Sequence, residues 1–469
     1  MARFASKVTK VGAYAMAVFI VSSLSFLLIQ LHLRQSGQPE SQRQTGSEPV
    51  EPVRKLPAQT KRRRNATKED FLESWEGRGV GVGVGPGPVT PGVDEIRHSI
   101  EFNNLNAEIL NEARYGIIKD PNVNISTVIV VQVHDRAKYL AQLVKSLGEA
   151  PGIQSTLLIF SHDVYSPEIN HIIRSITFCR VMQIFYPYSI QVFPDRFPGQ
   201  DPRDCPPDIG KDKAKEQRCQ NWEWPDKYGH YRVARYTQIK HHWWWKMNYV
   251  FEGIAKLRSY TGFLLLLEED HYVSPDFLHV FNLIVQNKQT LCPECGVISL
   301  GFYLKSYGTY GSNTGKLAVY PWFSSRHNMG MALDRATWDR IRNCSKLFCA
   351  YDDYNWDWSL MRVNMACLAP AKLTVVYAKA PRVFHIGDCG VHHKCRADTS
   401  AQKYAAIVEE NKGKLFPDKL EVSERSKRML RPPKENGGWG DVRDHELCNN
   451  NTRPHQLLPP SSLHHLTPL

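Results

Sequence analysis

Short β-branched runs alternate with segments of helical periodicity between residues 127 and 187. TVIVVQVH at 127–134 predicts a buried strand, and AKYLAQLVKSLGEA at 137–150 places apolar residues at helical spacing. STLLIFSHD at 155–163 and VMQIFYP at 181–187 predict two more strands, with a short helix at 168–174 between them. This β-α-β-α-β order predicts an α/β fold with a mostly parallel central sheet and flanking helices, in which ligands gather at the carboxyl ends of the strands.

The pattern breaks into a Pro-, Asp- and Gly-rich loop from about 194 to 231, and a helix is expected over 235–260. The helix contains three successive tryptophans, which point in different directions, so at least one is expected in an environment unlike that of the others. The run GFLLLLEED at 262–270 then predicts a fully buried parallel strand that ends in acid, and SPDF at 274–277 supplies a helix start.

That strand delivers three adjacent carboxylates, Glu268, Glu269 and Asp270, to a ligand-facing edge. Adjacent carboxylates repel one another, and a hard divalent cation is the partner that makes such a cluster favourable. Because Mg²⁺ and Mn²⁺ prefer one or two protein carboxylates plus phosphate oxygens, a diphosphate would be the natural ligand. The alternative is a solvated turn whose acids favour the start of the next helix.

The first hundred residues do not resemble a folded core. Residues 1–10 read as a cytoplasmic tail and residues 11–33, which carry no Asp, Glu, Lys or Arg, as a transmembrane signal anchor. A cleaved signal peptide is the alternative. Residues 34–92 are expected to form a flexible stem, residues 93–450 a lumenal catalytic domain, and residues 451–469 a disordered tail.

The net charge of +12 permits a nucleic-acid ligand, but many of the basic residues lie in the N-terminal region. We therefore discount nucleic acid and keep anionic small substrates such as nucleotide sugars. All 11 cysteines lie between Cys179 and Cys448, which suits an oxidising lumen. CPEC at 292–295 reads as a local disulfide, with a redox or half-zinc site as the alternative. Asn65 and Asn124 are glycosylation candidates.

An ordered series of motifs runs through residues 120 to 450: QVHDR at 132–136, FSHD at 160–163, QIKHHWWWK at 238–246, LEEDHY at 267–272, CPEC at 292–295, HNMGMAL at 327–333, YDDYNWDW at 351–358, FHIGDCG at 384–390 and NGGWGD at 436–441. Together these closely resemble the N-acetylglucosaminyltransferase II family. The resemblance implies a GT-A fold stapled by disulfides, type II Golgi membrane topology, a Mn²⁺ cofactor, and inverting transfer of GlcNAc from UDP-GlcNAc to the 2-hydroxyl of the α-1,6-arm mannose of an N-glycan. It also allows a homodimer.

Site roles follow from the same resemblance. Asp357, between Trp356 and Trp358, would be the catalytic base, although the residue types alone also fit a helix start. Asp270 and His385 would bind the metal, although a lone histidine is more often a core residue. The donor would be bound by Gln132, Val133, His134, Asp135, Arg136, Asp163, Gln238, Ile239, Lys240, His241 and His242.

The implied disulfides are Cys205–Cys219, Cys292–Cys295, Cys344–Cys367, Cys349–Cys448 and Cys389–Cys395, with Cys179 free. Two departures from the family stand out: Asp135 replaces an expected Asn, and segment 304–316 lacks an arginine, for which Lys305 could substitute. Two other classes of function remain open, namely an inactive membrane-tethered glycan-binding protein and a lumenal nucleotide-sugar hydrolase.

Overall fold

The computed structural model describes residues 91–116, 127–387, 397–430 and 434–454. The expected anchor at 11–33, the glycosylation candidates Asn65 and Asn124, and the pair Cys389 and Cys395 lie outside these residues. Among the described residues, no helix combines the length and apolar character needed to span a bilayer.

Nine strands form one central sheet in the order β11-β7-β9-β6-β8-β4-β1-β2-β3, and β10 and β5 form a separate pair. The strands are β1 Thr127–Val133, β2 Thr156–His162, β3 Arg180–Phe185, β4 Leu264–Glu268, β5 His271–Val273, β6 Val297–Gly301, β7 Lys316–Pro321, β8 Met329–Leu333, β9 Thr374–Ala378, β10 Val383–His385 and β11 Glu421–Arg425. Within the described sheet, β1 to β4 are mutually parallel along β3-β2-β1-β4, whereas β8 is antiparallel to both of its neighbours.

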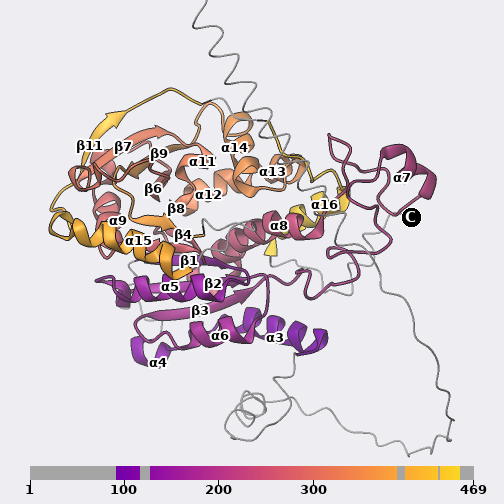
Figure 1. Cartoon of the computed structure of the whole chain (residues 1–469), viewed down its shortest axis with the longest axis horizontal. Coiled ribbons are helices and arrows are strands. Elements are labelled where there is room, and N and C mark those ends of the chain that lie inside the picture. The colour runs from indigo at the N-terminus through magenta and orange to yellow at the C-terminus, as the bar shows by residue number, and fades with distance from the viewer. Residues whose placement is uncertain (1–90, 117–126, 388–396, 431–433, 455–469) are drawn as a thin grey trace, which may run out of the picture. The chain divides into compact units, whose positions relative to one another are not determined.

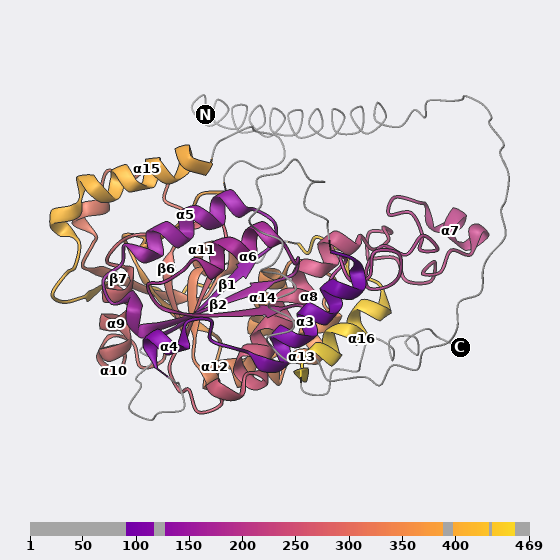
Figure 2. The ribbon, with the colours of Figure 1, turned by 90° about the horizontal axis from the view of Figure 1, so that it is seen from below.

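Helices surround this sheet (Figures 1 and 2). They are α3 Val93–Asn106, α4 Glu112–Tyr115, α5 Ala137–Gly148, α6 Pro167–Arg174, α7 Lys211–Gln217, α8 Ala234–Asn248, α9 Phe277–Gln286, α10 Lys288–Leu291, α11 Ser324–His327, α12 Arg335–Arg342, α13 Ser345–Ala350, α14 Trp356–Ala366, α15 Ala397–Glu410 and α16 Val442–Asn451. The expected α/β architecture, mostly parallel with flanking helices, is confirmed.

Alternation along the strands separates the two largest apolar clusters of the described residues, one on each face of the central sheet. Ile129 and Val131 of β1 pack in the cluster that includes α5, α6 and α9. Val128 and Val130 face the other way, into the cluster that includes α3, α8, α12, α13 and α14. Because successive side chains of a strand point to opposite faces, the apolar run Val128–Val131 of β1 can bury both sides. Burial on both faces leaves only the strand ends free for polar chemistry.

The helix expected over 235–260 is shorter than predicted. It begins at Ala234 and ends at Asn248, and a π-helical turn, Tyr249–Gly253, follows. A Cβ on Gly253 would lie 2.5 Å from the ring of Tyr249, so the chain can fold back here only at a glycine.

The three tryptophans differ in their neighbours, as expected: Trp243 and Trp244 pack against Trp338 and Phe348, whereas Trp245 packs against Tyr186 and Tyr249. Trp243, Trp244 and Trp245 are all fully buried in one cluster, because α8 is covered on several sides. Trp243 stacks on Trp356 of α14, with ring centroids 4.3 Å apart.

Four disulfides occur in the described residues: Cys205–Cys219, Cys292–Cys295, Cys344–Cys367 and Cys349–Cys448. These are four of the five pairs that the resemblance implied, and Cys179 is free and buried. CPEC is therefore a local disulfide. The bond from Cys349 to Cys448 joins α13 to α16 across 99 residues of sequence.

Candidate active site

Three neighbouring parallel strands end at the same edge of the sheet. In register, Gln132 of β1 lies opposite Glu268 of β4, and Val133 lies opposite His162 of β2. The residues that follow these strands therefore emerge side by side: His134 after β1, Asp163 after β2 and Glu269 after β4. The amide of Glu269 continues the ladder by donating to the carbonyl of Gln132 over 2.9 Å.

Asp163 is buried and gathers several of the predicted donor-binding residues. Its Oδ1 lies 2.7 Å from Nδ1 of His134, and its Oδ2 accepts a hydrogen bond from Nε2 of Gln238 over 3.0 Å. Nδ1 of His242 lies 3.7 Å from the same Oδ2. The hydrogen bond to Asp163 raises the pKa of His134 to about 9, so this pair is an imidazolium and a carboxylate at neutral pH.

Arg136 bridges two acids of the LEED sequence. Its Nε lies 2.9 Å from Oε1 of Glu269, and its Nη1 lies 2.9 Å from Oδ2 of Asp270. The amide of His134 donates to the other oxygen of Glu269 over 2.8 Å. The loop after β1 thus satisfies most of the hydrogen-bonding capacity of the Glu269 carboxylate. We therefore assign Glu269 to holding this loop in place rather than to binding a ligand.

Asp270 lies at the turn between β4 and β5, and β10 delivers His385 beside it. His385 pairs with His271 across the β5–β10 ladder, and its Nε2 lies 2.9 Å from Oδ2 of Asp270. A Cβ on Gly387 would lie 2.1 Å from that oxygen, so only glycine permits the chain to pass so close. The predicted metal ligands, far apart in sequence, are therefore adjacent in space.

A buried ion pair fixes the start of β10. Nε of Arg382 lies 3.0 Å from Oδ2 of Asp276, which follows β5, and both side chains are fully buried. The same guanidinium donates to the carbonyl of Thr314 over 2.8 Å. These contacts clamp β10 to β5 one residue before the ladder that ends at His385.

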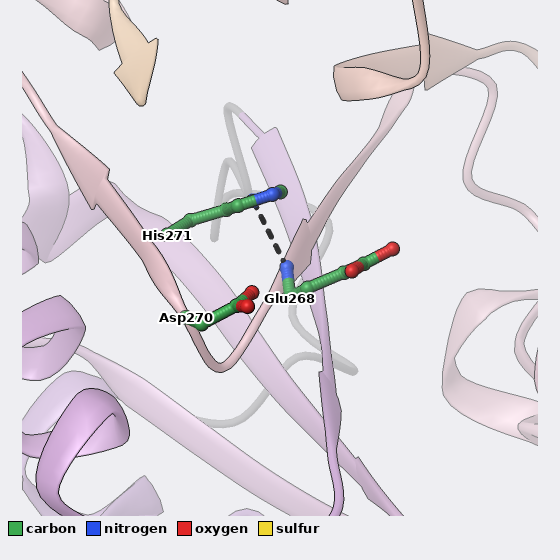
Figure 3. A group of neighbouring side chains, drawn as sticks. All are labelled: Glu268, Asp270 and His271. Atoms are coloured by element: carbon green, nitrogen blue, oxygen red, sulfur yellow. Dashed lines mark hydrogen bonds between the residues drawn. The ribbon is translucent and has the colours of Figure 1, made fainter. Parts of the chain in front are cut away.

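Glu268, Asp270 and His271, here called the acid corner, form a group that fits a divalent cation. One ligand atom from each of Glu268, Asp270 and His271 can be chosen such that all three lie within 4.8 Å of one another. Figure 3 shows Asp270 and His271 beside the end of β4, where Nδ1 of His271 accepts a hydrogen bond from the amide of Glu268 over 3.1 Å. Oδ1 of Asp270 is buried and has no hydrogen-bond partner among the described residues. An unpaired buried carboxylate oxygen is costly unless a ligand satisfies it.

The surroundings of Asp270 and Glu268 shift their pKa values in opposite directions. Burial would raise the pKa of Asp270, but the hydrogen bond from His385 and the positive charges nearby hold it below its ordinary value. Burial and repulsion from Asp270 instead raise the pKa of Glu268 to about 7. Asp270 is therefore the residue that stays ionised, as a metal ligand must.

Asp357 lies in the first turn of α14, half-buried. Nδ2 of Asn328 donates to its Oδ2 over 3.4 Å, and the amide of Trp358 donates to its Oδ1 over 3.0 Å. Burial raises its pKa to about 6 against the effect of these hydrogen bonds, and the charge of Asp353 adds to the rise. Asn328 directly precedes β8, which runs antiparallel to β4, so Asp357 is tied to the sheet edge at which β4 ends.

Helix α8 presents the remaining predicted donor residues in different directions. Gln238 and His242 lie one turn apart and face Asp163, whereas Ile239 is partly exposed. Lys240 and His241 are buried on other sides: Lys240 donates to main-chain carbonyls near α14, and Nε2 of His241 lies 2.9 Å from Oδ1 of Asp444 in α16. The structure does not bring these two residues to the strand ends.

Two other predicted donor residues, one at the end of β1 and one in the loop after it, also have surroundings unlike each other. Val133 is fully buried in the core, and only its backbone lies at the strand end. The carboxylate of Asp135 is mostly exposed, 3.7 Å from Nε2 of His134.

Sequence reasoning missed three residues of the site. His271 stands next to Asp270 in LEEDHY, so its adjacency was a usable signal. Asn328 lies in the motif HNMGMAL, but nothing in that motif shows that it reaches α14. Lys246, whose Nζ donates to Oε1 of Gln132 over 2.7 Å, lies two turns beyond Gln238 on the face of α8 toward β1.

Comparisons with known proteins identify the family of the chain. The family model for N-acetylglucosaminyltransferase II (MGAT2) matches residues 97–448. Relatives named alpha-1,6-mannosyl-glycoprotein 2-beta-N-acetylglucosaminyltransferase include the pig protein, 49% identical over 70% of this chain and 73% of its own. The human protein is 49% identical over the same shares, and the Arabidopsis thaliana protein is 34% identical over 68% of this chain and 73% of its own.

The match covers the whole sheet, from α3 to α16, and all the residues of the acid corner. On these grounds the chain belongs to the N-acetylglucosaminyltransferase II family and is an N-acetylglucosaminyltransferase.

Proposed function

We propose that this enzyme transfers GlcNAc from UDP-GlcNAc to the 2-hydroxyl of the α-1,6-arm mannose of an N-glycan, with inversion at the transferred sugar. The observation that carries this proposal is that Asp270, which follows β4, and Asp357, which is hydrogen-bonded to Asn328 directly before β8, lie at the same edge of the sheet. The name of the relatives, alpha-1,6-mannosyl-glycoprotein 2-beta-N-acetylglucosaminyltransferase, supports the transferred sugar and the acceptor arm.

Asp270 and His385 would hold the metal, which we propose is Mn²⁺, with His271 and Glu268 close enough to complete or adjust the ligand set. A bound cation supplies Lewis acidity and orients the diphosphate that departs. The unpartnered Oδ1 of Asp270 is the atom best prepared for it, because it is buried and would otherwise lose a hydrogen bond.

The donor nucleotide would lie across the ends of β1 and β2. Gln238 of α8 fixes the His134–Asp163 pair. The loop after β1, residues 134–136, presents its main chain and the guanidinium of Arg136 beside the acid corner. A guanidinium recognises phosphate oxygens through two parallel hydrogen bonds. Arg136 would therefore neutralise charge on the departing diphosphate.

Asp357 would act as general base. A single displacement needs one carboxylate to accept the proton of the acceptor hydroxyl, and inversion follows because no enzyme nucleophile intervenes. Its pKa of about 6 lies near neutral pH, where a base is both largely ionised and basic enough to accept a proton.

We further propose that the enzyme is a single-pass type II protein of the Golgi membrane whose catalytic domain faces the lumen. The uncharged run at 11–33 supports an anchor. The four disulfides support an oxidising compartment on the catalytic side.

The purified full chain in detergent tests the proposed reaction. With UDP-GlcNAc, Mn²⁺ and an N-glycan whose α-1,6-arm mannose is unsubstituted, it should release UDP and lengthen the glycan by one β-1,2-linked GlcNAc. Free GlcNAc formed without acceptor would instead indicate a nucleotide-sugar hydrolase. Glycan binding without any UDP release would indicate a lectin-like protein, and either result would reject the proposal.

A further inference from the structure

Lys240 was predicted to contact the donor, but in the structure its side chain contacts the residues that precede α14. It lies on α8 two residues after Gln238, about 200° around a helix of 3.6 residues per turn, and so faces away from Asp163. Its side chain is fully buried. The ammonium donates hydrogen bonds to the carbonyls of Tyr351 and Asp353, over 2.9 and 3.0 Å.

Both carbonyls belong to the acidic turn, residues 351–355, that directly precedes α14. Oγ of Ser359, in the first turn of α14, lies 3.0 Å from the carbonyl oxygen of Asn355 and 3.3 Å from that of Asp353, and its single proton can go to either. Asp357 lies between Asn355 and Ser359 in sequence. The ammonium of Lys240 therefore holds the main chain of the turn that leads directly into the first turn of α14, which carries the proposed base.

The carboxylate of Asp353 also holds this turn in place. Oδ1 of Asp353 accepts hydrogen bonds from the amide and side chain of Asn355, at 2.9 and 3.1 Å. Its Oδ2 accepts from the amide and side chain of Asn436, at 2.8 and 3.1 Å. All four partners are donors, so the carboxylate of Asp353 cannot be replaced by an amide without an NH₂ group facing other N–H groups.

Aromatic rings enclose the lysine. Its Nζ lies 4.0 Å from the ring centroid of Trp439 and 5.3 Å from that of Phe348. Burial lowers the pKa of Lys240 well below its ordinary value, against the charges of nearby acids. An ammonium placed this deeply costs free energy, which the carbonyls and the ring face offset.

We propose that Lys240 is a positioning residue: it fixes the acidic turn 351–355 and thereby the place of Asp357 relative to the donor residues on the opposite side of α8. The inference rests on the proposed function, because Asp357 is the base proposed above. Helix α8 thus contacts both parts of the proposed site. Gln238 and His242 lie beside Asp163, and Lys240 holds the turn that precedes Asp357.

The test compares Lys240→Met with Lys256→Met in the full chain. Methionine keeps most of the length and apolar bulk of lysine but cannot donate a hydrogen bond. Lys256 is a matched control, because its Nζ also donates to a main-chain carbonyl, that of Ala107, over 3.1 Å, and it is not one of the proposed site residues. Lys240→Met should lower kcat by about 10- to 100-fold, since a misplacement of about 1 Å can cost about 10². The KM for UDP-GlcNAc and the affinity for UDP should stay within about twofold, and Lys256→Met should change neither constant.

Kinetic constants are expressed per folded molecule, with the folded fraction measured by near-ultraviolet circular dichroism. Asp353→Asn provides an independent variant, because it loosens the same turn from its other side; it should show the same loss of kcat at constant KM. Faster amide hydrogen exchange in residues 355–360 of either variant should accompany the loss.

A raised KM for the donor at unchanged kcat would make Lys240 a donor contact and overturn the proposal. Unchanged constants per folded molecule would overturn it too, by reducing Lys240 to packing. These results differ from failure of the proposed function, which would appear as absence of transfer by the unsubstituted chain.

Discussion

Asp270 and Asp357 are both withdrawn from solvent at the same edge of the sheet, yet their surroundings differ in charge. Asp270 has Arg136 and His385 each 2.9 Å from one oxygen, and the hydrogen bond from His385 and the charge of Arg136 help to keep its pKa below the ordinary value despite burial. Asp357 has neutral hydrogen-bond donors, Asn328 and the Trp358 amide, and a like charge nearby. Burial therefore prevails at Asp357 and raises its pKa to about 6.

This difference suits the two aspartates to the two roles proposed for them. A metal ligand must remain ionised, and cationic neighbours ensure this. A general base must bind a proton during the reaction, and a raised pKa brings it closer to that state. Changing each residue separately should therefore alter different steps, and the predictions below test that separation.

Asp357→Asn should have the largest effect. Asparagine keeps the shape of the side chain but cannot accept the hydroxyl proton, so kcat should fall by about 10²–10⁴-fold, the usual contribution of general base catalysis. Affinity for UDP in the presence of Mn²⁺, measured by calorimetry, should remain close to that of the unsubstituted enzyme. A comparable loss in both quantities would contradict the assignment of Asp357 to proton transfer alone.

Asp270→Asn should act on binding instead. Loss of the ionised ligand should weaken Mn²⁺ affinity by at least about 10- to 100-fold, the range that even indirect partners of a metal contribute. Electron paramagnetic resonance of Mn²⁺ titrations measures this without reference to activity, and Glu269→Gln is a matched control at the neighbouring acid. Equal Mn²⁺ affinity in Asp270→Asn and the unsubstituted enzyme would remove Asp270 from the metal site.

The pH dependence of kcat should report the base. Because Asp357 must be deprotonated to accept a proton and its pKa is raised to about 6, kcat should fall as pH drops through about 6, by about tenfold for each further unit. Asp357→Asn should abolish this limb. A limb that persists unchanged in the variant would belong to another group.

Asp135→Asn, which restores the residue expected in the family, should have the smallest effect. The carboxylate is mostly exposed and lies 3.7 Å from His134, and exposed ion pairs contribute about 0–1 kcal/mol. The KM for UDP-GlcNAc should therefore change by less than about fivefold, with kcat constant. A larger change would show that Asp135 contacts the donor directly.

Sequence reasoning located the strands well because apolar runs and their alternation depend on local residues. The sequence alone therefore places the acid ending of β4 and the ends of its parallel neighbours at a ligand-facing edge, as in the structure. The helix at 235–260 was predicted too long, because the end at Asn248 depends on Gly253 and on packing around Tyr249 rather than on a strong local stop signal.

Roles within α8 were harder to predict. Five consecutive residues, 238–242, were assigned to the donor as a block, yet a helix turns by about 100° per residue and distributes them over separate surfaces. Only tertiary contacts, to Asp163 on one side and to Asp353 and Asp444 on others, separate Gln238 and His242 from Lys240 and His241. The link from Asn328 to Asp357 likewise depends on strand order, which no local pattern encodes.

A crystal structure of the full chain with Mn²⁺, UDP and an acceptor glycan tests the division of labour between the two aspartates most directly. The account predicts the ion on Asp270, with the diphosphate completing its shell, and the acceptor hydroxyl within hydrogen-bond distance of Asp357. An ion bound at Asp357, or an acceptor hydroxyl that meets a different carboxylate, would contradict it.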